Sequence, residues 1–497
     1  MLYQSTRDAS HKKYSAAEVI KMGLAPDGGL FIPDQMPTLT EDEISALCAD
    51  SYPVRAAKIL SKFLTDYTYD ELLEDCTKAY CEDSFPGGAA PLVHVKDNVY
   101  SLELWHGPTA AFKDMALQIM PRLLSRALTK TGEQRDALIL VATSGDTGKA
   151  ALEGYKDIDR ISIMVFYPVD GVSRVQKLQM ATQTGSNVNV CAIRGNFDDA
   201  QTGVKNIFAD ADIAQTLDSE GVFLSSANSI NWGRLAPQIV YYVSAYCDLL
   251  TRGDIKMGDK IDVCVPTGNF GNILAAYIAK CMGLPLRKFV CASNTNNILT
   301  DFLSTGTYDR NRPFHLTMSP SMDILISSNL ERLLCFTAGE DKTATYMESL
   351  KRDGVYSVDA DVKAAIAQNF VGFYADEAAT SKTIRDYFED ANYLADTHTA
   401  VALSAAEQYL ATCKEGDNTK MVVASTASPY KFASDVYTSL FGTSPSDPLA
   451  ALDELSEKTS TEIAYPLRGL GERKVNFTDV IDAADMPAEV VKYAKKN

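Results

Sequence analysis

The chain has 497 residues, more than one ordinary domain contains, so two or three packed units are expected. Hydrophobic residues make up 46% of it and charged residues 23%, a balance typical of a globular protein. The net charge of −18 disfavours a nucleic-acid partner, and no apolar run approaches the ~20 residues that span a bilayer, so no membrane partner is expected either. The first eight residues are polar and carry no apolar signal segment, which favours a cytoplasmic enzyme.

Residues 1–88 are expected to form a separate helical unit, with turn signals at residues 26–29 and 33–34. The ten cysteines of the chain include no Cys-x-x-Cys pair, and the five histidines show no ligand spacing. We therefore expect neither a disulfide framework nor a metal site.

From residue 137 to residue 267, short β-branched runs alternate with helical patterns. Strands are expected at 137–141, 161–167, 188–193, 222–225 and 261–265, with further strands at 288–292 and 421–425. Helices are expected between them, for example at 198–211 and 234–249. This alternation predicts a parallel sheet with helices on its faces. Residues 294–397 are mostly helical and charged in pattern, which indicates an insertion packed on the outside.

One lysine stands in an unusual setting. Lys113 follows Gly107-Pro108 and precedes a helical pattern that Pro121 kinks or restarts. By position alone it would be a solvated surface charge, as most lysines are. Its apolar neighbour Phe112 helps to desolvate the amine, which favours the neutral, nucleophilic form.

Two glycine-bearing loops lie downstream, at residues 143–148 and 266–272. Each follows a strand-like run and opens a helical one, so its backbone N–H groups suit a phosphate or a carboxylate. Either loop alone could be an ordinary strand-to-helix turn. A lysine together with a phosphate-binding loop is what an enzyme that uses pyridoxal 5'-phosphate (PLP) requires, because the amine forms a Schiff base and the loop anchors the phosphate.

A third polar run brings amide, hydroxyl and guanidinium groups together in Asn228, Ser229 and Arg234. Such groups bind phosphate, although alone the run would read as a helix cap followed by a surface arginine. The run Asp396-Thr397-His398-Thr399 is interpreted as a helix cap.

Taken together, these runs resemble the threonine synthase family, PLP enzymes of fold type II. Residues 23–33 resemble the opening signature of that family, and residues 425–432 resemble its motif Ser-Thr-Ala-His-Pro-Ala-Lys-Phe. The runs at 106–114, 143–148, 228–234 and 266–272 follow in the family's order, so the resemblance covers most of the chain. Three residues depart from the family pattern: Ser428 replaces a histidine, Tyr430 an alanine and Lys149 a small residue.

The resemblance implies an α/β fold of two open, twisted, mostly parallel sheets flanked by helices, with the helical N-terminal unit at 1–88. A large PLP-binding domain would comprise residues 89–135 and 235–497, including the helical insertion at about 294–397. A small α/β domain would comprise residues 136–234.

The resemblance also implies roles for individual residues. Lys113 would be the catalytic residue and form the Schiff base with PLP. The cofactor phosphate would lie on the backbone of Gly268, Asn269, Phe270, Gly271 and Asn272, and Thr426 would face the pyridine nitrogen. Ser144, Asp146 and Thr147 would receive the carboxylate of the substrate, and Asn228, Ser229 and Arg234 its phosphate.

The implied reaction converts O-phospho-L-homoserine and water to L-threonine and phosphate, by PLP-dependent γ-elimination and β-addition of water. Two alternatives stay open: a PLP-dependent phospho-lyase that releases 2-oxobutyrate, phosphate and ammonia from the same substrate, and a non-catalytic protein that binds a phosphometabolite. Retention of Lys113 and Thr426 argues against the second alternative. A small-molecule substrate is the expected partner, and a monomer is compatible with the sequence.

Overall fold

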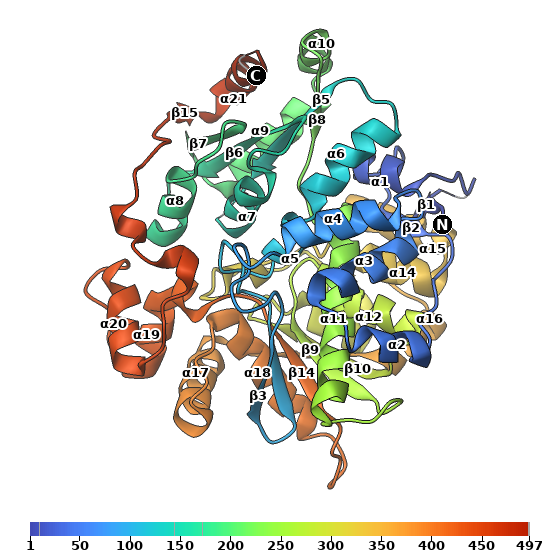
Figure 1. Ribbon diagram of the computed structural model, residues 1–497, viewed down its shortest axis with the longest axis vertical. Coiled ribbons are helices and arrows are strands. Elements are labelled where there is room, and N and C mark those ends of the chain that lie inside the picture. The colour runs from blue at the N-terminus through green and yellow to red at the C-terminus, as the bar shows by residue number, and fades with distance from the viewer. Residues whose placement is uncertain (9, 144, 171, 496–497) are drawn as a thin grey trace.

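Two sheets form the two halves of the molecule (Figure 1). The computed structural model describes residues 1–495 except 9, 144 and 171. The larger sheet has six strands in the order β13-β10-β9-β14-β4-β3, and all neighbours are parallel except β3 and β4. These strands are β3 (Leu92–Lys96), β4 (Val99–Glu103), β9 (Ile261–Pro266), β10 (Leu286–Ser293), β13 (Phe370–Tyr374) and β14 (Met421–Ser425).

The smaller sheet has five parallel strands in the order β15-β7-β6-β5-β8. They are β5 (Asp136–Ala142), β6 (Ile161–Pro168), β7 (Val188–Arg194), β8 (Val222–Ser225) and β15 (Val480–Asp482). The fold class predicted from the sequence, two mostly parallel sheets with helices, is confirmed by this arrangement.

The end of the chain departs from the expected domain division. Residues 235–497 were all expected in the large domain, but β15 pairs with β7 at the edge of the smaller sheet. The strand is three residues long and largely exposed, so it carries no hydrophobic pattern that a sequence could reveal. The following helix, α21 (Met486–Ala494), packs against the same half.

The N-terminal unit combines helices with a two-stranded sheet, and it lies beside the larger sheet (Figure 1). Its elements are β1 (Tyr3–Ser5), α1 (Ala16–Met22), β2 (Phe31–Pro33), α2 (Glu41–Leu47), α3 (Tyr52–Phe63) and α4 (Tyr69–Ala79). The helices α1, α2 and α4 each begin with a capping box, in which a Ser or Thr and a Glu three residues later exchange hydrogen bonds.

Helices α5 to α12 connect the strands of the two sheets. They are α5 (Asp114–Leu117), α6 (Met120–Lys130), α7 (Asp146–Tyr155), α8 (Arg174–Ala181), α9 (Phe197–Ala209), α10 (Ala211–Ser219), α11 (Trp232–Arg252) and α12 (Gly271–Met282). Pro121 stands in the first turn of α6, so the helical pattern after Lys113 restarts there, as the sequence allowed.

The segment expected as a helical insertion is more mixed than predicted. It contains α13 (Ile298–Thr305), β11 (Thr307–Asp309), the 3₁₀ turn η1 (Pro320–Met322), α14 (Leu330–Ala338), α15 (Glu340–Asp353), β12 (Val355–Ser357), α16 (Ala360–Asn369) and α17 (Glu377–Ala391). It also supplies β13, which extends the larger sheet at its edge. The remaining elements are α18 (Thr397–Leu410), η2 (Pro429–Phe432), α19 (Ala433–Phe441), α20 (Ala450–Thr459), η3 (Tyr465–Leu467), η4 (Leu470–Glu472) and η5 (Ala483–Asp485).

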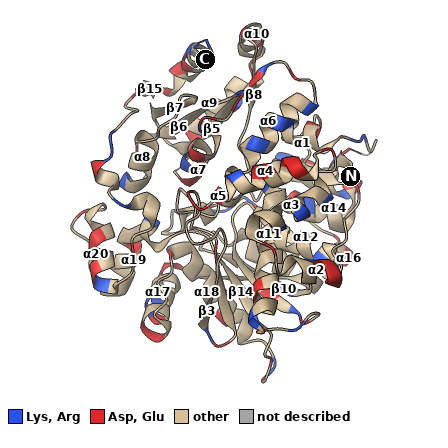
Figure 2. Cartoon of the chain, in the orientation of Figure 1, with Lys and Arg blue, Asp and Glu red and all other residues tan. Residues whose placement is uncertain are grey.

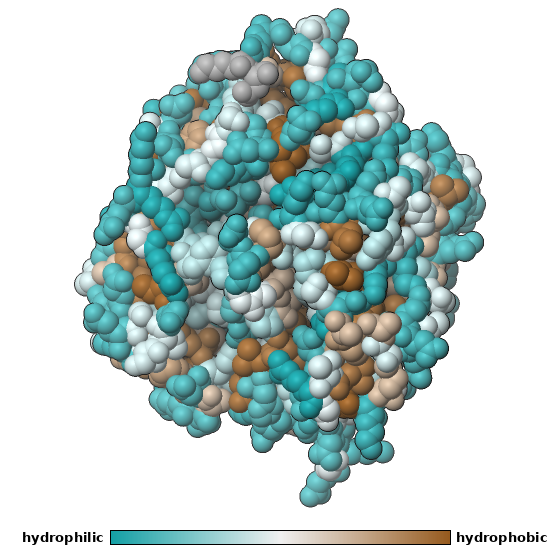
Figure 3. All heavy atoms as spheres, in the orientation of Figure 1, coloured by the Kyte–Doolittle hydropathy of each residue, from teal (hydrophilic) through white to brown (hydrophobic). Residues whose placement is uncertain are grey.

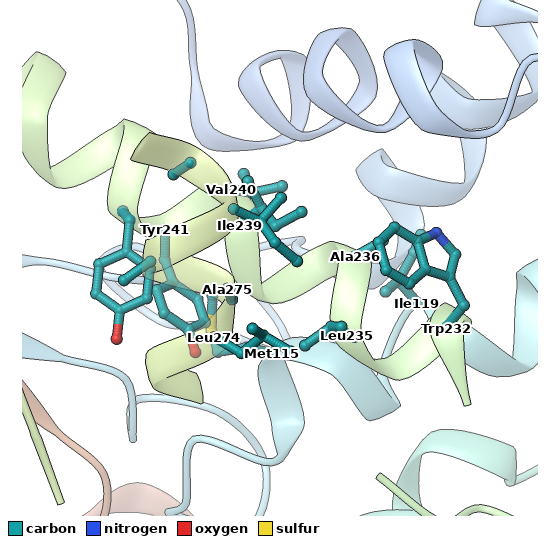
Figure 4. Packing of buried hydrophobic residues seen from close by; sticks show 14 of the residues in the cluster. Met115, Ile119, Trp232, Leu235, Ala236, Ile239, Val240, Tyr241, Leu274 and Ala275 are labelled. Atoms are coloured by element: carbon teal, nitrogen blue, oxygen red, sulfur yellow. The ribbon is translucent and has the colours of Figure 1, made fainter. Parts of the chain in front are cut away.

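Helix α11 runs through the main hydrophobic core. Figure 4 shows Leu235, Ala236 and Ile239 of this helix beside Met115 of α5, with Trp232 at the helix start. The Trp232 ring meets Tyr3 edge-on at 5.4 Å, which joins the N-terminal unit to this core. Burying such large side chains fixes the position of the segments that precede α5 and α11.

Charged residues lie mainly on the outer helices, whereas the strands of both sheets are largely uncharged (Figure 2). The face seen in Figure 3 is mostly hydrophilic, with scattered apolar patches. Among the described residues, no helix is long and apolar enough to cross a membrane.

Candidate active site

Lys113 is the N-cap residue of α5, a helix that lies between the two halves of the molecule (Figure 1). The segment before it is tied to the segment after β14: the N–H of Phe112 donates to the carbonyl oxygen of Thr426 at 2.8 Å, and Ala111 bridges Ala427. These contacts bring Lys113 and Thr426 together from positions about 300 residues apart. The Thr426 side chain is buried, and its hydroxyl makes no hydrogen bond within the described part of the chain.

The amine of Lys113 is nearly buried, with 13% of its side chain exposed. Its Nζ lies 3.4 Å from Oγ of Ser321 and 3.7 Å from a carboxylate oxygen of Asp146. Burial lowers the pKa of Lys113; Asp146 opposes this effect, and the charges of Lys431 and Arg234 add to it. This lowering makes the neutral amine, the form that acts as a nucleophile or a base, easier to reach than in an exposed lysine.

Asp146 begins α7 and is almost fully buried. Its carboxylate pairs with Nζ of Lys431 at 3.0 Å and accepts from the Gln176 amide at 2.8 Å. Burial alone would raise the pKa of Asp146, but the charges of Lys431 and Lys113 hold it well below its usual range. A fixed carboxylate repels another carboxylate. The charge of the Asp146 side chain therefore disfavours the predicted direct contact between this side chain and the substrate carboxylate.

The loop at 268–272 joins β9 to α12. Its carbonyl oxygens are tied down, since Gly268 accepts from Oγ of Ser327 at 2.6 Å and Asn269 accepts from the N–H of Asn329 at 3.0 Å. Its N–H groups donate to no acceptor in the described part of the chain. A Cβ at Gly268 would lie 2.6 Å from the backbone oxygen of Ser321, so only glycine fits there.

The side chain of Asn272 faces inward from the same loop. Its Oδ1 accepts from the hydroxyls of Tyr241, at 2.8 Å, and Tyr242. Its Nδ2 is buried without a hydrogen-bond partner. Free N–H groups at a helix start and an unpartnered amide donor fit the phosphate of PLP.

The loop at 143–148 uses two of its N–H groups internally. Oγ1 of Thr143 accepts from the N–H groups of Gly145 and Gly148, both at 3.0 Å. Thr147 is half-buried at the start of α7, and Ser144 lies outside the described residues.

Arg234 stands in the first turn of α11 and is buried. It donates to the carbonyl oxygen of Ala227 at 2.7 Å, and its Nε is buried without a partner. Burial lowers the pKa of Arg234 to about 10. Asn228 is exposed and accepts from the Ser229 hydroxyl at 3.4 Å. The three residues expected to bind the substrate phosphate thus lie at the start of one helix, and the arginine has no carboxylate partner among the described residues.

The three departures from the family motifs have partners away from Lys113. Oγ of Ser428 caps η2 by accepting from the N–H of Tyr430 at 3.3 Å. The Tyr430 hydroxyl donates to the carbonyl oxygen of Thr461 at 2.8 Å, so it fastens the C-terminal segment. Lys149 pairs with Glu153 of the same helix at 2.9 Å.

Four further residues at this site were not predicted: Ser321, His398, Lys431 and Gln176. Asp396 caps α18, as predicted, but it also accepts from Nδ1 of His398 at 2.8 Å. Nε2 of His398 in turn accepts from the N–H of Ser321 at 3.1 Å, which fixes η1 over Lys113. The sequence signal for Lys431 was its place in the motif at 425–432; Ser321 has none.

Three family models together span nearly the whole chain. The model of the threonine synthase N terminus matches residues 2–80, that of pyridoxal-phosphate dependent enzymes residues 86–425, and that of the threonine synthase C-terminal part residues 399–484. Threonine synthase from Pseudomonas aeruginosa is 37% identical over 462 residues, which cover 92% of this chain and 95% of that protein. The chain belongs to the threonine synthase family. This membership confirms the predicted resemblance, and with it the prediction of a PLP-dependent enzyme.

Solved threonine synthases share the fold over the whole length. The PLP-bound threonine synthase from Brucella melitensis has a TM-score of 0.88 at 35% identity and covers 100% of this chain and 99% of its own. The human protein named threonine synthase-like 1 is 39% identical over 459 residues and 90% of this chain. The matched region is 59% of that relative's length.

Proposed function

We propose that this member of the threonine synthase family converts O-phospho-L-homoserine and water to L-threonine and phosphate. The observation that carries the proposal is that Lys113 and the loop of free N–H groups at 268–272 both lie beside Ser321, in a chain similar to threonine synthases from end to end. A nearly buried amine and a phosphate cradle are the two features that PLP chemistry needs.

Cofactor binding is assigned to residues in the half that contains the larger sheet. Lys113 would form the Schiff base, and the N–H groups of residues 268–272, with Nδ2 of Asn272, would hold the cofactor phosphate. Thr426, whose hydroxyl is without a protein partner among the described residues, would face the pyridine nitrogen. Bound PLP withdraws electrons from the substrate carbons Cα and Cβ.

The remaining steps belong to side chains of this chain. Nζ of Lys113 removes the Cα proton as a general base, and a second deprotonation, at Cβ, allows phosphate to leave from Cγ. Cγ then gains a proton, water adds at Cβ, and Nζ of Lys113 returns a proton to Cα. Arg234, Asn228 and Ser229 bind the substrate phosphate and stabilise its charge as it leaves Cγ. The substrate carboxylate is assigned to Ser144 and to Asp146 and Thr147, the residues at the start of α7. For Asp146 we propose that its N–H group makes the contact, because its charged side chain would repel another carboxylate.

The phospho-lyase alternative uses the same residues up to the loss of phosphate, so product identification separates the two reactions. Threonine from O-phospho-L-homoserine supports the proposal, whereas 2-oxobutyrate and ammonia as the main products would replace it. A monomeric state and a cytoplasmic location stay predictions.

The test of the cofactor assignment uses Lys113→Ala and Lys113→Arg. The purified wild type should show the visible absorption of a PLP Schiff base, and borohydride should fix the cofactor on the peptide that contains Lys113. Both variants should lose turnover and labelling with little change in the free energy of unfolding, and Arg keeps the positive charge as a control. Labelling of another lysine would overturn the assignment.

A further inference from the structure

Asp146 joins the two halves of the molecule at the active site. It belongs to α7, beside the smaller sheet, while Lys113, Lys431 and Ser321 belong to segments of the larger half. Its carboxylate meets all three, at 3.7 Å for Lys113, 3.0 Å for Lys431 and 3.1 Å for Ser321. The proposed reaction steps use Lys113 but leave Lys431 without a role.

Lys431 is an unusual lysine because its side chain is wholly buried. Besides Asp146 it contacts the carbonyl oxygen of Thr109, to which Nζ donates at 2.9 Å. A buried ammonium is costly unless it is paired and hydrogen-bonded, and Asp146 is the carboxylate that pairs with it. Lys431 and Asp146 therefore form a fixed ion pair.

Of the side chains that contact the Asp146 carboxylate, Lys113 is the most distant. Gln176 donates to Oδ1 at 2.8 Å, and the Ser321 hydroxyl donates to Oδ2 at 3.1 Å. Ser321 is held in place by the hydrogen bond from its N–H to His398. Nζ of Lys113 lies 3.7 Å from the Asp146 carboxylate, so the two charges interact but form no short hydrogen bond.

We propose that Lys431 is a positioning residue that neutralises Asp146 and so keeps Nζ of Lys113 out of a tight ion pair, free to exchange protons with the substrate. The inference rests on the proposed function, in which Lys113 is the base. Without Lys431, the Asp146 carboxylate would have Lys113 as its only lysine partner and would hold its nitrogen in the protonated form.

The charges around Nζ give the direction of each effect. Asp146 and Asp114 favour a protonated nitrogen on Lys113, and Lys431 and Arg234 oppose it. Asp146 in turn faces His398 as well as the two lysines. Removing the charge of Lys431 should raise the pKa of the Lys113 nitrogen, and removing the charge of Asp146 should lower it.

The experiment is a spectroscopic pH titration of the holoenzyme, because the Schiff-base nitrogen is Nζ of Lys113 itself. Five proteins are compared: the wild type, Lys431→Gln, Asp146→Asn, the double variant and Lys431→Arg. The midpoint of the absorption change should move up by about one pH unit in Lys431→Gln and down by about one in Asp146→Asn. In the double variant the midpoint should return close to the wild-type value. The single variant Lys431→Arg keeps the positive charge, so its midpoint should also lie close to that of the wild type.

A matched control is Lys149→Gln, which removes another buried lysine of the same region, one paired with Glu153. It should leave the midpoint unchanged. Equal midpoints in all these proteins would overturn the inference and leave the proposed function intact. Spectra that stay constant with pH in all of them would do the same. Absence of the Schiff-base band from the wild type would instead overturn the proposed function.

Discussion

The two glycine loops of the site look alike in sequence and differ in what they do with their backbone. Each follows a parallel strand, carries a threonine at its start and opens a helix. In the loop after β5, Thr143 turns forward and accepts from two N–H groups of its own loop. In the loop after β9, the Thr267 hydroxyl points back and donates to the carbonyl oxygen of Val265 at 2.7 Å, so the N–H groups ahead of it stay free.

The difference shows that a glycine pattern alone does not define an anion site. The direction of one hydroxyl decides how many N–H groups at the helix start are used by the protein itself and how many are left for a ligand. The loop after β5 presents the side chains of Asp146 and Thr147, while the loop after β9 presents its backbone. Substitutions in the two loops should therefore fail in different ways.

The largest effect is expected from Gly271→Asp in the loop after β9. A side chain fits there, since a Cβ would have its nearest contact at 3.5 Å, from Asn329. The new carboxylate would compete for the free N–H groups and repel a phosphate, at a cost of roughly 3–6 kcal/mol in PLP binding, which is at least about 100-fold in affinity. Titration with PLP measures the loss, with Gly271→Ala as the mild control. PLP affinity equal to the wild type would show that the phosphate binds elsewhere.

A smaller effect, of another kind, is expected from Thr143→Val in the loop after β5. Two buried N–H groups would lose their acceptor, which should lower the free energy of unfolding by about 2–4 kcal/mol. Denaturant unfolding measures this change, and Thr143→Ser should restore most of the stability. The absorption spectrum of bound PLP should stay as in the wild type. If the variant kept its stability but bound PLP poorly, the loop after β5, and not the loop after β9, would be the one that binds the cofactor.

The smallest effect is expected from Tyr242→Phe, behind the loop after β9. It removes one of the two hydroxyls that donate to Asn272, and Tyr241 remains. We expect a loss of about 1 kcal/mol in the free energy of unfolding and little change in PLP affinity. Unfolding and PLP titration on one preparation measure both quantities. A large loss of PLP affinity would mean that the Asn272 side chain, more than the backbone, holds the phosphate.

The sequence predicted those parts of the fold whose residues repeat a simple pattern. The strand expected at 161–167 appears as β6 (Ile161–Pro168), and that at 261–265 as β9 (Ile261–Pro266), because buried parallel strands are continuous β-branched runs. The strand β4 was missed, although it is buried throughout, because Ser101 and Glu103 interrupt its apolar run. The strand β13 was hidden in a segment with charged helices on both sides.

The residues of the candidate site also fall into those that the sequence could predict and those that it could not. Lys113 and both glycine loops stand out locally, and the family motifs gave their order. Ser321 did not, since its place over Lys113 depends on hydrogen bonds from a distant helix through His398. The ion pair of Asp146 with Lys431 joins helix α7 of one half to the turn η2 of the other, and no spacing in the sequence encodes it.

The position of β15 in the chain affects when the smaller sheet can be completed during synthesis. Its partner β7 ends at Arg194, nearly 290 residues earlier, and Met486 of the following helix packs onto Gly203, where an added Cβ would lie 2.5 Å from its sulfur and force that side chain to shift. A ribosome delivers β5 to β8 long before it delivers this segment. The smaller sheet thus keeps an open edge beside β7 until nearly 290 further residues have been synthesised.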